Sequence, residues 1–451
     1  MLLSKRGKRA INQPLRADLD LFYEAMENRY DESENPDGVF TLCIAENILN
    51  WKEMEAKLRE VAAGPIPDWV PSYTAILGAP PLREAAAGLL KRFLAGVDLD
   101  AERLAIAAGA AAVIEMCALL LGDPGDVVVI PGPAYMAYTP DIANKAELER
   151  YDLFHLAPST ASASGGPALR KQDANSANYA FPTYYELTTD DLDRAHAELG
   201  DRFRVLLLTQ PNNPTGQVYT EQQIADFSNW CVEREIHLVF NEIYALSMID
   251  QDHDDLIDDY GERRWFTSSL RWLEQQKSPY LHWWYAISKD FGLSGLRLGM
   301  AYTYNEDLLK AWSNYGSTSM TSNHTQWMMA EIFTDLDWVA AFVRANTQRL
   351  SDSYATVIQV LRKHDIAYAR AMGSLFVWLD LSAFLTADTE EAELALWREV
   401  YDKTGILLTS PVGMGSPQRG WLRMVYSCVS LAELGVAMAR FDHWLGLRPG
   451  N

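Results

Sequence analysis

The chain has 451 residues, of which 48% are hydrophobic and 22% are charged. A chain of this length buries a large core and is long enough for two domains. Its 39 Lys and Arg residues are outnumbered by 61 Asp and Glu residues, which gives a formal net charge of −22 at pH 7. This excess of negative charge argues against broad electrostatic binding to nucleic acid or to an anionic membrane, but leaves room for a local cationic pocket.

The cysteines and the N-terminus bear on the compartment of the protein. No CxxC pair of the kind that binds zinc or exchanges disulfides occurs among Cys43, Cys117, Cys231 and Cys428, so we interpret them as buried thiols in a reducing compartment. Basic residues near the N-terminus are not followed by an apolar run, and no stretch approaches the length of a membrane span. We therefore expect a cytoplasmic protein with no membrane partner.

Through the middle of the chain, short β-branched or aliphatic runs alternate with longer helical patterns. This alternation is typical of a parallel α/β sheet. Between the second and third runs, Ile224, Phe227 and Cys231 recur at helical spacing, which indicates a β-α-β unit. The predicted strands are residues 127–130, 205–208, 237–240, 283–287 and 298–302.

Two polar segments interrupt this pattern. Residues 157–178 are rich in Ser, Ala, Gly and Asn, which predicts a surface insertion that is either a plain loop or a substrate lid. The acidic run 250–261 lacks the Gly and Glu that a calcium-binding loop needs at its sixth and twelfth positions, so no metal site is expected there.

After about Asn323 the pattern becomes mainly helical, with a short strand expected at residues 375–379, as in a smaller α+β domain. We therefore predict an N-terminal segment 1–64 that belongs to the small domain, a large domain 65–322, and a C-terminal small domain 323–451.

The most unusual residues stand just after the predicted strands. Tyr135, Asn213, Tyr244 and Lys289 each follow one of them. In open α/β sheets, ligands bind beyond the carboxyl ends of the strands. The sequence therefore predicts one shared site.

The segment 286–299 combines a lysine just after a strand with an arginine eight residues later, Lys289 and Arg297. Desolvation there lowers the pKa of the lysine and favours the neutral amine that condenses with an aldehyde. The arginine offers a planar charged fork to a phosphate. The same pair could equally flank a structural Gly-rich turn, so the segment alone leaves both interpretations open.

Ordered motifs extend along nearly the whole chain, from about Phe22 to the C-terminal helix. They are Asn35-Pro-Asp-Gly, Ala45-Glu-Asn47, Tyr73, Asp123-Pro-Gly-Asp, Pro131-Gly-Pro-Ala-Tyr135, Asn212-Asn-Pro-Thr-Gly216, Glu242-Ile-Tyr244, Ser288-Lys-Asp-Phe-Gly-Leu-Ser-Gly-Leu-Arg297 and Trp421-Leu-Arg423. With these motifs in this order, the chain resembles the fold-type I pyridoxal 5′-phosphate (PLP) enzymes. Within them it is most similar to the 1-aminocyclopropane-1-carboxylate (ACC) synthase branch of the class I/II aminotransferases.

This resemblance implies an α/β fold of the PLP-dependent transferase type I, with a mainly parallel sheet flanked by helices and a smaller α+β domain. Lys289 would form the Schiff base and shuttle the proton. Tyr135 would stack on the pyridine ring, while Asn213 and Tyr244 would hydrogen-bond the cofactor's O3′. The phosphate-binding residues implied are Arg297, Ser288 and the turn Gly109, Ala110 and Ala111.

The resemblance also assigns substrate contacts. Arg423, with Asn213 beside it, would take the α-carboxylate as a bidentate pair. Tyr73 would reach the site of a neighbouring subunit, which implies a homodimer with shared active sites. Glu46 would be a buried carboxylate facing a cationic substrate such as a sulfonium, or else it caps a turn.

Three positions depart from the family pattern. Asn241 stands where the family places an aspartate against the pyridine nitrogen, in the pattern Asp-Glu-x-Tyr. A neutral amide does not favour the protonated pyridine, so the electron sink is expected to be weaker. Either the natural reaction needs a weaker sink, or the residue is a substitution that slows turnover. Ala286 and Ala111 lack two hydroxyl ligands of the phosphate, which the helix N-terminus after Gly109 would partly replace.

Three functions remain open at this point. The first is an ACC-synthase-like lyase that expels methylthioadenosine from S-adenosylmethionine, or a γ-substitution variant of it in natural-product biosynthesis. The second is an aminotransferase that moves an amino group between an amino acid and a 2-oxo acid. The third is a binding protein without chemistry, which the complete set of Lys289, Arg297, Asn213, Tyr244 and Arg423 argues against.

Overall fold

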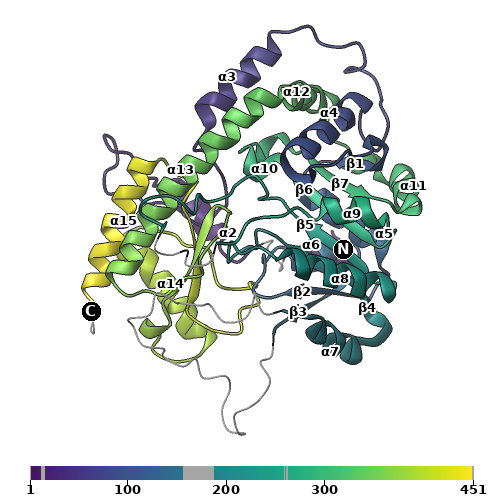
Figure 1. Ribbon diagram of the computed structural model, residues 1–451. Coiled ribbons are helices and arrows are strands. Elements are labelled where there is room, and N and C mark those ends of the chain that lie inside the picture. Colours follow the sequence, from purple (N-terminus) through teal and green to yellow (C-terminus); the bar gives the residue numbers. More distant parts are fainter. Residues whose placement is uncertain (1, 12–15, 156–186, 258–259, 261–262, 449–451) are drawn as a thin grey trace.

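The computed structural model describes residues 2–11, 16–155, 187–257, 260 and 263–448. The predicted insertion at 157–178 lies outside the described residues, as does part of the acidic run 250–261. Over the rest of the chain, the fold consists of a seven-stranded sheet flanked by helices and a two-stranded sheet with its own helices (Figure 1).

The large sheet has the strand order β1-β7-β6-β5-β4-β2-β3. Strands β2 to β6 pair in parallel, whereas β7 runs antiparallel to both of its neighbours. The strands are β1 (Leu104–Ala107), β2 (Val127–Pro131), β3 (Glu149–Leu153), β4 (Phe203–Thr209), β5 (His237–Asn241), β6 (Leu281–Ala286) and β7 (Gly299–Thr303).

All five strands predicted in the middle of the chain are confirmed, while β1 and β3 were missed. Strand β1 has only four residues, too few for a recognisable pattern. Strand β3 reads Glu-Arg-Tyr-Asp-Leu and is only partly buried at the edge of the sheet, so it lacks the apolar run of a central strand.

The central strands are buried on both faces, and their side chains alternate between two cores. In β4, Leu206 and Leu208 pack in one cluster with Phe227 of α8, whereas Val205 and Leu207 pack in another with Cys117 of α5. The helices around this sheet are α5 (Ala110–Leu121), α6 (Tyr138–Ala143), α7 (Thr189–Leu199), α8 (Glu221–Glu233), α9 (Leu270–Gln276), α10 (Ile287–Asp290) and α11 (Glu306–Tyr315).

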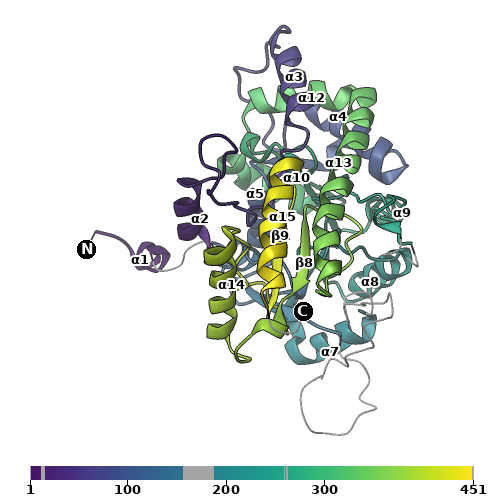
Figure 2. The same ribbon diagram turned by 90° about the vertical axis from the view of Figure 1, so that its left-hand side faces the viewer.

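The second sheet pairs β8 (Phe376–Asp380) with β9 (Trp421–Val425) in antiparallel register. The strand expected at 375–379 is thus confirmed, whereas β9 was not predicted. Figure 2 shows α13 (Leu336–Lys363), α14 (Glu390–Thr404) and α15 (Leu431–Gly446) around these strands. The remaining α-helices are α1 (Lys5–Ile11), α2 (Leu19–Met26), α3 (Trp51–Ala62), α4 (Pro80–Leu90) and α12 (Asn323–Thr334).

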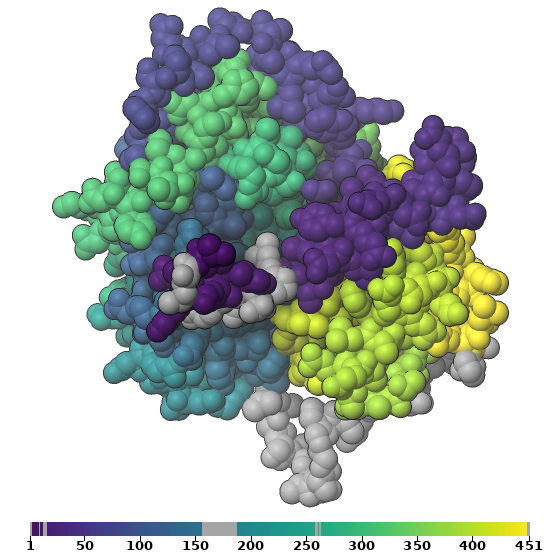
Figure 3. All heavy atoms as spheres, turned by 180° about the vertical axis from the view of Figure 1, so that it is seen from behind, coloured from purple at the N-terminus to yellow at the C-terminus, as the bar shows by residue number. Residues whose placement is uncertain are grey.

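The N-terminal segment joins the small sheet's part of the molecule. Phe40 pairs with Ile406 in a parallel bridge, and its side chain belongs to the core cluster around β8 and β9. Figure 3 shows residues of this segment, in purple, on the surface between the blue large domain and the yellow-green C-terminal part. The domain limits at 64 and 322 remain predictions.

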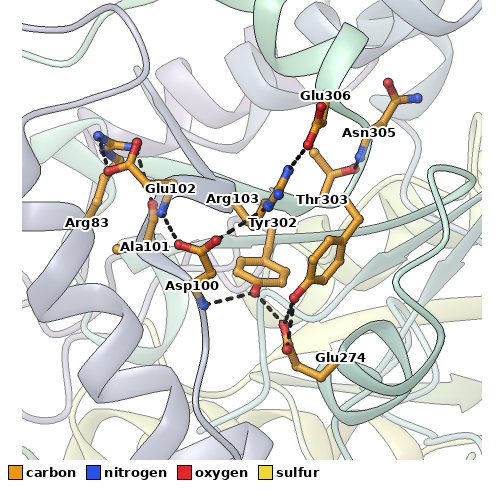
Figure 4. Close-up of polar contacts among 11 residues, drawn as sticks. Arg83, Asp100, Ala101, Glu102, Arg103, Glu274, Tyr302, Thr303, Asn305 and Glu306 are labelled. Atoms are coloured by element: carbon orange, nitrogen blue, oxygen red, sulfur yellow. Dashed lines mark hydrogen bonds and ion pairs between the residues drawn. The ribbon is translucent and has the colours of Figure 1, made fainter.

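A polar network lies at the β1 edge of the large sheet (Figure 4). The backbone N–H of Asp100 donates to the Tyr302 hydroxyl (3.1 Å), which in turn donates to Glu274. Arg103 forms ion pairs with Asp100 (3.5 Å) and Glu306 (3.2 Å). These bonds tie the segment just before β1 to β7 and to α11.

Within the described residues, no helix is both long and apolar enough to cross a membrane. Across the same residues, no three His, Cys, Asp or Glu side chains gather in a way that could hold a metal ion. Cys43, Cys117 and Cys231 are buried free thiols, as expected, and Cys428 is a partly buried one.

Candidate active site

A cavity of about 220 Å³ opens at the carboxyl ends of the parallel strands, between the two sheets. The predicted convergence is therefore found in the structure. The predicted residues that line the cavity are Tyr135, Asn213, Asn241, Tyr244, Ser288, Lys289, Arg297, Arg423, Ala110 and Ala111.

Lys289 lies on the short helix α10, directly after β6. Its Nζ donates a hydrogen bond to the backbone oxygen of Ala45 (2.5 Å). Burial, together with the positive charge of Arg423, lowers the pKa of Lys289 to about 8, and the negative charge of Glu46 opposes this shift. A substantial fraction of the amine is therefore neutral near pH 8, as required for attack on an aldehyde.

Arg297 and Gly109 form an anion cradle. Gly109 precedes the twelve-residue helix α5, with φ +91° and ψ 173°, a conformation that is open essentially to glycine alone. A Cβ placed on Gly109 would lie 2.4 Å from the Nη2 of Arg297, so the guanidinium packs directly on the glycine. The Nη1 of Arg297 donates to the backbone oxygen of Ser294 (2.8 Å). A fixed guanidinium beside a helix N-terminus suits a phosphate group.

Arg423 comes from β9 and is 1% exposed. It donates to Asn213 Oδ1 (2.7 Å), to the Cys43 backbone oxygen (3.1 Å) and to Thr409 Oγ1 (3.1 Å). Among the described residues, no carboxylate lies within ion-pair distance of it. Burial and the nearby Arg16 lower the pKa of Arg423 to about 10. A buried cation without a carboxylate partner is a strong site for a carboxylate ligand.

Aromatic and amide groups surround the space between these cations. The Tyr135 ring meets the Tyr138 ring edge-on, with centroids 5.5 Å apart. Asn213 Nδ2 donates to the Tyr244 hydroxyl (3.4 Å), so the two residues expected at O3′ lie together. Asn241, at the end of β5, lines the same cavity.

Sequence reasoning missed five polar residues that line the cavity: Arg16, Tyr138, Asp141, Thr209 and Ser294. Tyr138 and Asp141 lie on α6, and Thr209 is the last residue of β4. The end of a predicted strand could have marked Thr209. Arg16 carried no signal, because it stands in a short polar stretch far from every motif.

Two expected substrate contacts lie elsewhere. Glu46 was expected to be a buried carboxylate, but it is exposed and accepts a hydrogen bond from Ser294 Oγ (3.1 Å). It is absent from the lining of the cavity, although its charge acts on Lys289. Tyr73 is fully exposed and does not line its own chain's cavity either.

These groups fit PLP. Lys289 offers a partly neutral amine, the cradle of Arg297 and Gly109 accepts a phosphate, and Tyr135 offers an aromatic face. The cradle in particular would be hard to explain without an anion, since Arg297 has no carboxylate partner among the described residues and adopts a left-handed conformation (φ +51°).

Comparison with known proteins agrees with this chemistry. The chain is 26% identical to 1-aminocyclopropane-1-carboxylate synthase 7 of Arabidopsis thaliana over 94% of this chain and 90% of that protein. It is 27% identical to a Mus musculus protein named "Probable inactive 1-aminocyclopropane-1-carboxylate synthase-like protein 2", over 98% of this chain and 72% of that protein.

A solved structure of an aspartate aminotransferase single mutant of Thermus thermophilus has the same fold. It superposes with a TM-score of 0.73 at 20% identity, over 98% of this chain and 99% of that one. The model of the family "Aminotransferase class I and II" matches residues 70–441. The chain therefore belongs to the class I and II aminotransferase family and is a PLP-dependent enzyme.

Proposed function

We propose that the protein removes the α-proton of S-adenosylmethionine and releases methylthioadenosine from its Cγ, by elimination or by γ-substitution. The observation that carries the proposal is the placement of Lys289 and Arg423 on one cavity. PLP, when bound, withdraws electron density from Cα and so weakens the Cα–H bond.

The protein's own residues then have separate tasks. Arg423 binds the α-carboxylate and fixes the direction of the Cα–H bond. Lys289 Nζ, whose pKa is about 8, accepts the α-proton. Asn213 holds Arg423 on one side and the Tyr244 hydroxyl on the other, so the carboxylate site and the cofactor site share one rigid amide.

Glu46 supports the choice of a sulfonium substrate. It is hydrogen-bonded to Ser294, three residues before the phosphate-site Arg297, and its negative charge acts on Lys289. A carboxylate at this position attracts the positive sulfur of S-adenosylmethionine. The ACC synthases among the relatives support the same substrate.

A second function, transamination with a 2-oxo acid, is favoured by Arg16. This arginine lines the cavity close to Arg423 and brings a second guanidinium to it. A second guanidinium suits a substrate with a second carboxylate, such as glutamate or 2-oxoglutarate.

One experiment separates the two functions. Purified protein is incubated with S-adenosylmethionine, and separately with glutamate and a 2-oxo acid, with Lys289→Ala as the blank. At saturating S-adenosylmethionine, release of methylthioadenosine is expected, and its rate should fall much more in Glu46→Gln than in Arg16→Gln. Amino-group transfer that depends on Arg16, without methylthioadenosine, would replace the first proposal by the second.

We also propose a homodimer with shared active sites. Tyr73 is expected at the phosphate, is fully exposed, and does not line the cavity of its own chain. Mixed dimers of Tyr73→Ala and Lys289→Ala chains should then regain activity, because one of the two sites has both residues. No gain on mixing, under conditions in which the subunits exchange, would contradict the shared site.

A further inference from the structure

The side-chain amide of Asn241 has a defined orientation. It is 5% exposed and stands at the end of β5, at the position where the family carries the carboxylate that faces the pyridine nitrogen. The backbone N–H of Ile243 lies 3.2 Å from one of its terminal atoms. Because a backbone N–H only donates, that atom must be the acceptor Oδ1. Nδ2 is therefore the atom that lies 2.7 Å from the Tyr138 hydroxyl.

The Tyr138 hydroxyl extends this arrangement. It accepts from Asn241 Nδ2, and Thr209 Oγ1 lies 2.7 Å away on its other side. A buried hydroxyl hydrogen needs an acceptor, so Tyr138 donates to Thr209. Burial raises the pKa of Tyr138 to about 12, which keeps this phenol neutral. Asn241 therefore donates to Tyr138, and Tyr138 donates to Thr209.

One N–H of Asn241 remains. An amide nitrogen carries two hydrogens, and only one of them is used toward Tyr138. Within the described part of the chain, the second finds no acceptor, and Asn241 lines the cavity. We propose that Asn241 donates this N–H to the ring nitrogen of bound PLP, which is thereby held unprotonated, and that Tyr138 and Thr209 are positioning residues that impose this donor direction.

This inference rests on the proposed binding of PLP in the cavity and sharpens the reaction. A protonated ring nitrogen has no lone pair to accept from an amide N–H, so the two states exclude each other at this contact. An unprotonated ring withdraws less electron density from Cα. The enzyme would then favour substrates that carry a good leaving group, such as a sulfonium. Substrates whose reaction depends only on electron withdrawal by the ring would react more slowly.

Asp141 is the side chain at the cavity that could protonate the ring nitrogen of PLP, in competition with the hydrogen bond from Asn241. It is the carboxylic acid among the residues that line the cavity, and it follows Tyr138 by one turn of α6. Burial and the negative charge of Glu115 raise its pKa to about 7, so it is partly protonated near neutral pH. A proton on the ring nitrogen would have to come from this side chain or from solvent.

The test uses the full chain loaded with PLP that is 15N-labelled at the ring nitrogen. Solid-state 15N NMR near pH 7.5 distinguishes a neutral pyridine from a pyridinium without any turnover. We expect the neutral-pyridine shift in the wild type and in Asp141→Asn, and the pyridinium shift in Asn241→Asp. The aspartate fits, because it accepts from Ile243 N–H and from a Tyr138 hydroxyl that has turned away from Thr209.

Tyr138→Phe tests the positioning role. Without Tyr138 as acceptor the amide keeps only its bond from the Ile243 N–H and is held less firmly, so the 15N shift should move toward that of a pyridine without a hydrogen bond. Tyr315→Phe, at an exposed tyrosine, should leave it unchanged. A pyridinium shift in the wild type would overturn the inference, and its loss in Asp141→Asn would identify Asp141 as the proton source. No labelled PLP bound through Lys289 would instead refute the proposed function itself.

Discussion

Arg16 and Arg423 donate hydrogen bonds to the same backbone oxygen, that of Cys43, at 3.2 and 3.1 Å. Two guanidinium groups so close repel each other, and one buried carboxylate offsets this repulsion. Asp18 accepts from Arg16 Nε (2.9 Å) and Nη2 (2.5 Å) and is fully buried. Asp18 thus offsets the charge of Arg16, whereas Arg423 has no carboxylate partner among the described residues.

Replacing Arg16 by Gln should weaken substrate binding indirectly. Asp18 would lose its partner and pair with Arg423, whose pKa it already raises, so the substrate carboxylate would meet an occupied guanidinium. We expect KM to rise about tenfold, ~1.4 kcal/mol, with a smaller change in kcat. Steady-state kinetics check this. The double variant Arg16→Gln/Asp18→Asn should recover most of the loss, and a double variant as impaired as the single one would refute the explanation.

The pKa of Lys289 predicts how the PLP-free protein takes up its cofactor. Only the neutral amine attacks the aldehyde, so the rate of uptake should rise with pH through a midpoint of about 8 instead of 10.5. Burial is the first cause of this shift and the charge of Arg423 the second, so Arg423→Met should move the midpoint upward. Stopped-flow absorbance of PLP measures both midpoints, and a midpoint unchanged by Arg423→Met would remove the electrostatic part of the explanation.

Gly109→Ala should weaken the binding of PLP. The backbone of Gly109 has φ +91° and ψ 173°, where a side chain costs about 1–3 kcal/mol, and the new methyl would displace the Arg297 guanidinium. We expect the Kd for PLP to rise at least about tenfold, as measured by equilibrium titration. Gly88→Ala on α4 is the matched control, because its Cβ meets nothing within 4 Å. Equal affinity in the two variants would argue against the cradle.

A buried histidine pair predicts a loss of stability in mild acid. His237 Nδ1 lies 3.0 Å from His282 Nε2, and His282 Nδ1 lies 2.8 Å from Thr303 Oγ1. Burial lowers the pKa of His237 from 6.5 to about 4 and that of His282 well below 6.5. As the pH falls from 6.5 toward 4, the unfolded chain binds protons that the folded chain does not, so the free energy of unfolding decreases.

The expected decrease is about 2 kcal/mol for each imidazole between pH 7 and pH 5. Urea unfolding at the two pH values measures it. His282→Gln should reduce this pH dependence, while the exposed His324→Gln should not. The same slope in both variants would show that other groups govern acid stability.

The sequence alone determined the central strands and the residues at their carboxyl ends. Short runs of mostly apolar residues are typical of strands buried on both faces, so β2, β4, β5, β6 and β7 were predictable. Parallel strands bring their ends to one edge of the sheet, and the motifs around Lys289 and Arg423 named the cofactor. The short strand β1 and the polar edge strand β3 lack that pattern, since their pairing depends on neighbours that are distant in the chain.

The tertiary structure decided which other groups reach the cavity, how exposed they are and in which direction they form hydrogen bonds. Arg16 is more than 400 residues from Arg423 in the chain, and only folding brings both to the Cys43 oxygen. Glu46 looked like a buried carboxylate in its motif, yet it is exposed and bonds Ser294 instead. The sequence showed that Asn241 replaces a carboxylate, but the direction of its hydrogen bonds required the positions of Ile243 N and the Tyr138 hydroxyl. The residue type determines which hydrogen bonds a side chain can make. The direction of those bonds depends on partner groups that the fold brings in from other parts of the chain.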